Sequence, residues 1–114
     1  MAAYLSNKEL REEIIRCKEK DELTRVAIDM FYLMVGKFTW NFRYKYPEDR
    51  KDCEAEAIID LYLYWRGYDP AKSQNAFAYY TQIIKNGFAK GWRRLYDKYP
   101  SGAKRISVDL IHSI

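Results

Sequence analysis

One helical face in the second half of the chain carries side chains that suit an unpaired strand of nucleic acid. In "NAFAYYTQIIKNGFAKGWRR", residues 75–94, helical spacing places Tyr79, Gln82, Asn86, Lys90 and Arg93 in one row. A tyrosine ring can stack on a base, amides can bond to a base edge, and cations attract phosphates. The same row is also typical of a solvated basic surface helix, so spacing alone leaves both interpretations open.

The other face of this segment is apolar and predicts close packing against a second helix. Its members are Phe77, Tyr80, Ile84, Gly87, Phe88, Gly91 and Leu95. Glycine inside a helix costs up to about 1 kcal/mol relative to alanine. Two glycines on the apolar stripe therefore indicate that another helix approaches closely. The alternative is that Asn86 and Gly87 end the helix early.

Charge is distributed unevenly along the 114 residues. Residues 48–69 contain seven acidic and three basic side chains, whereas residues 85–105 contain seven basic and one acidic. The whole chain has a formal net charge of +4 and a pI near 9.0. This polarity suggests two partners of different charge.

The start of the chain predicts two helices. Ser6 and Glu9 have the spacing of a capping box, so a helix is expected to follow Ser6 and to end near Lys18. Residues 23–40 repeat apolar side chains at helical spacing without a proline, which predicts a second, largely buried helix.

The rest of the chain predicts two more helices and no strands, so the expected class is all-α with about four main helices. Residues 41–51 contain Pro47 and are expected to form a loop. A third helix, residues 52–67, is expected to end at Gly67, and its second half is apolar almost all round. Such a helix has neighbours on several sides or a partner on one. The fourth helix is the opening segment, capped by Ser or Asn and ending near Leu95 or Tyr96.

The residue types give little support for catalysis or metal binding. Cys17 and Cys53 lack metal-ligand spacing, and His112 alone cannot complete a zinc site. Glu54 and Asp60 are not arranged with a partner that would make acid-base chemistry persuasive, and no Gly-rich phosphate loop is present. We therefore expect a protein that is not an enzyme and holds no cofactor or metal.

The segment composition predicts one helical domain, residues 1–100, and a tail, residues 101–114. From Ser6 onward the N-terminus is polar and contains no apolar signal core. The longest apolar stretch, residues 26–38, contains Asp29 and Lys37 and is too short to span a bilayer. We expect a cytoplasmic protein with no membrane partner, monomeric when free.

A family resemblance covers roughly residues 25–95. The segment "KDCEAEAIIDLYLYWRGYDPAKSQNAFAYYTQIIKNGFAKGWRR" resembles region 2 of the sigma-70 family of bacterial transcription initiation factors, where an acidic helix precedes a helix with a Phe-x-x-Tyr-x-Thr-type start. The chain is most similar to the reduced late-promoter sigma factors of T-even-type bacteriophages, through "NKEL", the turn before "DP" and "AYYTQ". The resemblance implies a helical domain that binds core RNA polymerase and captures the melted minus-ten element of late promoters.

The resemblance assigns a polymerase-binding surface to the third helix. Its residues are Asp52, Ala55, Glu56, Ile58, Ile59 and Tyr62. In family members this face grips the clamp helices of the largest polymerase subunit. Typical members have amides where this chain has Ala55 and Ile58, which shifts the expected interface toward apolar burial around the two remaining acids.

The resemblance also assigns a promoter face to the fourth helix. Its residues are Tyr79, Gln82, Ile83, Lys85, Asn86, Lys90, Arg93 and Arg94. Tyr79 matches the aromatic residue that stacks on the flipped base, and Asn86 matches an amide that reads the upstream edge of the element. Gln82 and Ile83 stand where primary sigma factors place a Trp pair. Weaker unaided melting, or help from a co-activator, is therefore expected.

The C-terminal segment "SVDLIHSI" is similar to the peptide with which the T-even-type factors bind the DNA sliding clamp. The matching residues are Ser107, Val108, Asp109, Leu110 and Ile111. A short apolar tail can enter a groove on a partner, and packing of the tail on its own domain is an equal alternative. The resemblance implies no second DNA-binding domain.

Two other functions stay open at the level of the sequence. A polymerase-independent helical regulator that binds DNA or RNA would explain the basic helix but would leave the acidic third helix without a role. A sigma mimic or anti-sigma adaptor would occupy the clamp site and block initiation. Only a transcription assay would distinguish such an adaptor from a sigma factor.

Overall fold

The fold is all-α, as the sequence predicts, in a computed structural model that describes residues 6–44 and 46–98. In these residues there are four α-helices and no strand. The helices are α1 (Asn7–Lys20), α2 (Arg25–Phe38), α3 (Pro47–Tyr64) and α4 (Ala76–Lys98). Two short 3-10 helices, η1 (Thr39–Asn41) and η2 (Trp65–Gly67), extend α2 and α3.

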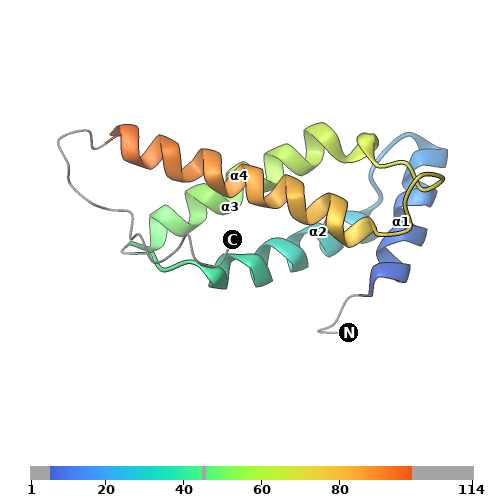
Figure 1. Ribbon diagram of the computed structural model, residues 1–114, viewed down its shortest axis with the longest axis horizontal. Helices are drawn as coiled ribbons and strands as arrows, with labels where there is room; N and C mark the ends of the chain where they lie inside the picture. The colour runs from blue at the N-terminus through green and yellow to red at the C-terminus, as the bar shows by residue number, and fades with distance from the viewer. Residues whose placement is uncertain (1–5, 45, 99–114) are drawn as a thin grey trace.

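The helices form an elongated bundle in which α3 and α4 cross and α2 runs along the same core (Figure 1). α1 closes the end of the bundle where α4 begins (Figure 1). Asn7 ties that end together, because its side chain donates to the Gln74 carbonyl at 2.8 Å and accepts from the Phe77 amide at 2.9 Å. Among the described helices, none combines the length and the apolar character needed to cross a membrane.

Two glycines allow α3 and α4 to approach closely. A Cβ built on Gly87 would lie 2.6 Å from Ala57 Cα, and one built on Gly91 would lie 2.9 Å from Cys53 Cα. Both distances are too short for a real side chain, so the predicted close approach is confirmed. α4 continues well past both glycines, and the alternative that the helix ends at Asn86 and Gly87 is wrong.

The N-terminal capping box is confirmed. Ser6 Oγ accepts from the Glu9 amide at 3.1 Å, and Glu9 Oε1 accepts from the Ser6 amide at 3.2 Å. These bonds satisfy donors that the first turn of a helix leaves without partners. α1 ends at Lys20 and is capped by Asp21, which adopts the left-handed conformation with φ 57°.

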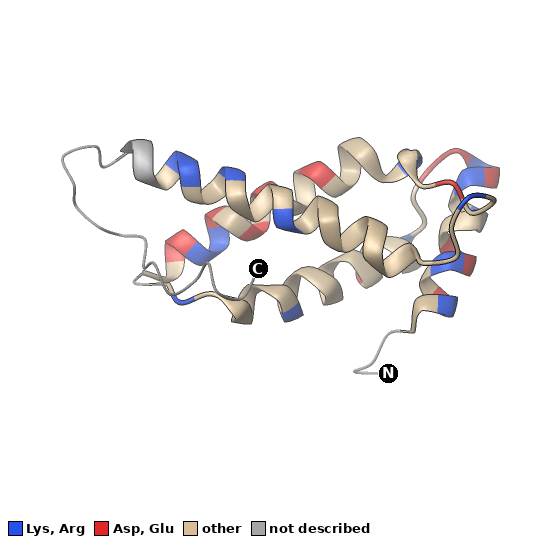
Figure 2. Ribbon diagram, in the orientation of Figure 1, with Lys and Arg blue, Asp and Glu red and all other residues tan. Residues whose placement is uncertain are grey.

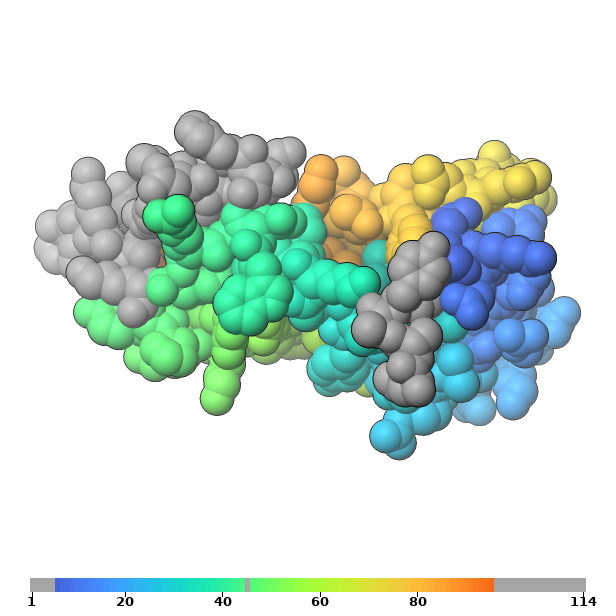
Figure 3. Space-filling view, turned by 90° about the horizontal axis from the view of Figure 1, so that it is seen from below, coloured from blue at the N-terminus to red at the C-terminus, as the bar shows by residue number. Residues whose placement is uncertain are grey.

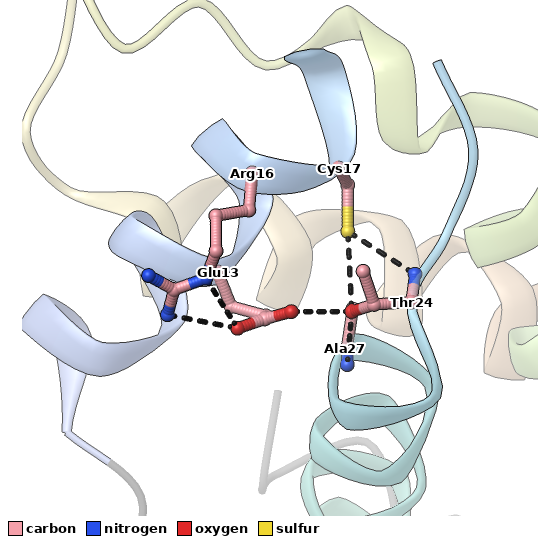
Figure 4. Close-up of polar contacts among 5 residues, drawn as sticks. All are labelled: Glu13, Arg16, Cys17, Thr24 and Ala27. Atoms are coloured by element: carbon pink, nitrogen blue, oxygen red, sulfur yellow. Dashed lines mark hydrogen bonds and ion pairs between the residues drawn. The ribbon is translucent and has the colours of Figure 1, made fainter. Parts of the chain in front are cut away.

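Thr24 holds the junction between α1 and α2 (Figure 4). Its hydroxyl oxygen accepts from the Ala27 amide at 3.1 Å, which caps α2, while the hydroxyl donates to Glu13. Cys17 Sγ lies 3.4 Å from the Thr24 amide nitrogen. Burial favours a higher pKa for Glu13, but hydrogen bonds from Thr24 and Arg16 outweigh it and hold that pKa below the ordinary 4.5.

Two expectations about the middle of the chain are wrong. α3 begins at Pro47, so residues 47–51 are helical where a loop was expected. Proline is favoured in the first turn of a helix because its missing N–H has no partner there in any case. α2 is less buried than expected, since Val26 and Tyr32 are more than half exposed.

Candidate functional site

α3 and α4 contact each other through charges as well as through apolar side chains. Lys90 Nζ donates to Asp60 Oδ1 at 2.6 Å and lies 3.8 Å from Glu56 Oε1. Arg94 donates to the second oxygen of Glu56. We call these four residues the seam charges. Figure 2 shows the acidic segments of α3 beside the basic segments of α4.

The seam charges neutralise each other within the fold. Glu56 and Asp60 are both buried, and a buried carboxylate is costly unless it is paired and hydrogen-bonded. The hydrogen bond to Asp60 raises the pKa of Lys90 above its ordinary 10.5, although burial acts in the opposite direction. Part of the charge polarity of the sequence is therefore internal, which weakens the case for two oppositely charged partners.

The solvent-facing side of α3 displays apolar side chains. We define the outer surface of α3 by Asp52, Ala55, Ile58, Ile59 and Tyr62. Ile58 is half-buried and the other four are exposed, with Ile59 and Tyr62 the large apolar side chains. Exposed apolar residues grouped on one face mark interaction sites more often than isolated ones do.

Two hollows flank this surface at Ala55 and Ile59, which line both of them. One, of about 410 Å³, lies against α2 and is also lined by Tyr32 and Gly36. The other, of about 280 Å³, lies against α4 and is also lined by Leu95. A raised apolar strip between two hollows is a shape into which side chains of a partner can pack.

The structure brings the predicted polymerase-binding residues together, and Glu56 lines the same hollow as Ala55 and Ile59, but its carboxylate is not free. Asp52, Ala55, Ile59 and Tyr62 face solvent on the same side of α3. The Glu56 carboxylate is instead buried and bonded to Arg94. The interpretation of Glu56 as an acid available to a partner is corrected, because α4 already occupies it.

Part of the predicted promoter face is an open polar row on α4. We define the α4 polar row by Gln82, Lys85, Asn86 and Arg93. Gln82 and Asn86 are exposed, and Gln82 Nε2 donates to Asn86 Oδ1 at 3.0 Å. Arg93 is exposed and makes no hydrogen bond or ion pair with the side chains of residues 6–44 and 46–95. Two amides and two cations at the surface can contact base edges and phosphates.

Three other predicted DNA contacts are engaged within the protein. Ile83 is buried in the core cluster, so it lies beneath the surface and not at the edge of the polar row. Lys90 and Arg94 are seam charges and hold the acids of α3. The assignment of Ile83 is corrected because its side chain is buried, whereas Lys90 and Arg94 stay predicted DNA contacts, since their side chains are 40% and 70% exposed beside their ion pairs.

Tyr79 is partly buried against η2. Its ring centroid lies 5.6 Å from that of Tyr68 and 5.0 Å from that of Tyr80, and its hydroxyl donates to the Tyr64 carbonyl at 3.2 Å. Burial raises the pKa of Tyr79. Gly67 leaves room for the hydroxyl, since a Cβ there would lie 2.1 Å from Tyr79 Oη. These contacts give the ring a packing role, whereas the sequence interpretation made it a free stacking surface.

The sequence interpretation did not single out a pocket at the connection between α2 and α3. We call it the aromatic pocket; it measures about 610 Å³ and is lined by Trp40, Phe42, Arg43, Tyr44, Tyr46, Pro47 and Arg50. The signal that could have found it is the density of rings and cations in "WNFRYKYPEDR". Periodicity does not detect such a site because most of it lies between helices.

Buried thiols and acids do not form a metal-binding group in the described part of the chain. Cys17 and Cys53 are free and buried, and burial raises the pKa of Cys53 to about 12. Within residues 6–44 and 46–98, no group of three or more His, Cys, Asp or Glu side chains could hold a metal ion. The predicted sliding-clamp residues, 107–111, lie outside the described residues.

Comparison with protein-family models, with curated proteins and with solved structures found no match. Function is therefore inferred from the residue patterns of the chain and from the surfaces described above.

Proposed function

We propose that the chain is a small sigma-type transcription factor that binds bacterial core RNA polymerase and holds melted promoter DNA. The outer surface of α3 would contact the clamp helices of the largest subunit, and the α4 polar row would contact the single strand. The observation that supports this best is the exposure of Ile59 and Tyr62 at positions that the sequence resemblance assigns to polymerase binding.

The energetics of the outer surface favour a protein partner. Full burial of a large apolar side chain is worth about 1.5–3 kcal/mol, and Ile59 and Tyr62 each have roughly half of that still to gain. The two hollows beside Ala55 offer places for partner side chains. A helical partner would present side chains at the spacing that such hollows require.

The α4 polar row supports the DNA part of the proposal. Asn86 and Gln82 can exchange their mutual hydrogen bond for bonds to a base edge, and Arg93 is open to a phosphate. None of these three side chains needs to break a contact with the core. Promoter contact through this row does not require Tyr79 to leave its packing site.

The proposal is tested by co-elution of the full chain with bacterial core RNA polymerase. Ile59→Arg places a charge at the centre of the outer surface and is expected to weaken binding by more than about tenfold. Val26→Arg is the matched control, because Val26 is 51% exposed and Ile59 is 50% exposed. Absence of co-elution by the unmodified chain, or equal binding by both variants, would contradict the proposal.

Glu56 is a poor choice for this test. Glu56→Arg would place a third cation beside Lys90 and Arg94 and remove the carboxylate that both of them contact. Loss of polymerase binding by that variant would therefore report damage to the packing of α3 on α4 as readily as loss of an interface.

A transcription assay separates the proposed activator from a sigma mimic. A sigma-type factor, which would act in the bacterial cytoplasm, would support initiation in an assay with core polymerase and promoter DNA. A sigma mimic would instead inhibit initiation by another factor in the same assay. Sliding-clamp binding by residues 107–111 is a further proposal that rests on the sequence alone. Pull-down with a sliding clamp, using the full chain and a version lacking residues 107–114, tests it.

A further inference from the structure

The aromatic pocket has a floor held in place by the core. Phe42 is buried and stacks on Phe88, with ring centroids 5.3 Å apart and an interplanar angle of 19°. Tyr44 stacks on Trp92 with centroids 5.7 Å apart and an angle of 5°. The Thr39 hydroxyl donates to Tyr44 Oη at 3.1 Å. The floor of the pocket is therefore held by contacts within the protein.

The rim of the pocket combines an exposed indole with two arginines. Trp40 is 71% exposed, and the Arg50 guanidinium lies 5.2 Å from its ring centre. Arg43 is also exposed, and none of the lining residues is acidic. Figure 3 shows this connection between α2 and α3, in green, on the outside of the molecule.

Arg50 has spare capacity to donate a hydrogen bond. Its Nε atom is buried without a hydrogen-bond partner among the described residues. Glu54 of the same helix forms an ion pair with Arg50, but its Oε2 lies 4.0 Å from this nitrogen, which is beyond hydrogen-bond range. A buried donor without a partner is costly, so an anionic acceptor near Arg50 would be favoured.

We propose that the aromatic pocket binds one nucleotide of a single-stranded nucleic acid, with the base stacked on Trp40 and the phosphate beside Arg43 and Arg50. An exposed π-face next to cations is what an unpaired base with its phosphate requires, and a duplex does not offer such a base. The volume lies within the usual range for a small-molecule site. The site requires neither polymerase nor the α4 polar row, so it goes beyond the proposed function.

Tryptophan fluorescence gives a direct readout of the pocket. Trp40 is exposed, whereas Trp65 and Trp92 are only 2% and 5% exposed. Titration of the full chain with a single-stranded oligo(dT) twelve-mer is expected to quench emission, while the same oligonucleotide paired in a duplex is expected to quench it far less. Quenching that is equal for both forms would overturn the proposal.

Anisotropy of a labelled oligo(dT) measures how much each side chain contributes. Trp40→Ala is expected to weaken binding about 5- to 150-fold, the range for loss of one base–aromatic stack, and Trp40→Phe is expected to retain most of the affinity. Tyr64→Ala removes another exposed ring, 56% exposed against 71% for Trp40, on a different part of the surface and is the control. Because Trp40 is exposed, circular dichroism should show that all three variants fold.

Salt dependence tests the phosphate contact. Arg43→Gln is expected to lower the slope of log affinity against log salt by about 0.7, the value for one contact to a single strand. An unchanged salt slope in Arg43→Gln together with an unchanged affinity in Trp40→Ala would overturn the proposal. Competition by poly-glutamate as effective as by oligo(dT) would also overturn it, because it would show that charge alone is recognised.

A comparison of variants separates this inference from the proposed function. If only Gln82→Ala and Asn86→Ala weaken single-strand binding, the α4 polar row is the site and the pocket proposal fails. If Trp40→Ala weakens it while the protein does not bind core polymerase, the pocket proposal stands and the sigma-type function fails.

Discussion

The two sides of α3 divide charge and apolar surface less cleanly than those of an ordinary amphipathic helix, because acids are buried beside Cys53, Ala57 and Leu61 while apolar side chains are exposed on the other side. The side that packs on α4 contains buried acids, Glu56 and Asp60, whereas the outer surface exposes Ile59 and Tyr62. Buried acids are stable only with fixed partners, so the inner side is structural. Exposed apolar side chains gain stability only when something covers them, so the outer side is the part of the helix available for binding.

The inner side of α3 depends most on close backbone approach, which gives the largest expected effect. Gly87→Leu would force α3 and α4 apart at Ala57 and should lower the free energy of unfolding by about 3 kcal/mol. Urea denaturation followed by circular dichroism measures this. Gly36→Ala is the control, since nothing lies within 4 Å of its added Cβ, and it should raise stability by up to about 1 kcal/mol.

Equal stability changes for these two glycine variants would mean that α3 and α4 do not approach as closely as the structure shows.

The seam charges are the next test of the inner side. Lys90→Met leaves Asp60 without its 2.6 Å partner. The loss should be about 1–2 kcal/mol, less than for a fully buried pair because the lysine side chain is partly exposed. A double-mutant cycle with Asp60→Asn isolates the coupling between the two residues. A coupling free energy indistinguishable from zero would show that the pair does not stabilise the inner side.

A substitution of Glu13 tests whether another buried acid of this chain also stabilises the fold. Its folded pKa is lowered, so its stabilising effect is complete above about pH 4.5 and is lost as the pH falls through the folded pKa. Glu13→Gln should therefore reduce stability by about 1 kcal/mol at pH 7. The difference between the two proteins should shrink when unfolding is measured at progressively lower pH. A stability difference that grows as the pH falls would contradict a lowered pKa of Glu13 in the folded protein.

Substitutions on the outer surface of α3 should change the free energy of unfolding least. Ile59→Arg is expected to change the free energy of unfolding by less than about 0.5 kcal/mol, since half of the side chain is already in water. Thermal unfolding of this variant beside Lys90→Met measures the contrast between the two sides. A larger loss for Ile59→Arg than for Lys90→Met would contradict the division of α3 into a structural and a binding side.

Local signals in the sequence predicted much of the fold. Ser6 and Glu9 form the expected capping box, and Gly87 lies where the apolar stripe of α4 requires a small residue. The capping box depends on neighbours within one helix, and the close approach at Gly87 depends on the small size of the residue. The start of α3 at Pro47 differs from the expected loop, because proline is typical of loops but is also favoured in a first helical turn.

The paired charges and the packed aromatic residue could not be predicted from one segment at a time. Glu56 and Asp60 are four residues apart, as are Lys90 and Arg94, and this matched spacing is the signal that antiparallel helices would pair them. The pattern of α4 does not predict the packing of Tyr79, because its hydrogen-bond partner, the Tyr64 carbonyl, and the Tyr68 ring lie outside its own helix. Sequence patterns identify the faces of a helix, but tertiary packing decides which face is covered.

The most direct test of the account is the affinity of bacterial core RNA polymerase for two variants, one on each side of α3, compared with the unmodified chain. The account predicts that Ile59→Arg lowers the affinity by more than about tenfold. Lys90→Met, studied where it is fully folded, should stay within about threefold, because it acts on the inner side. The reverse order, or equal affinity for all three proteins, would contradict the claim that the outer surface of α3 is the docking surface.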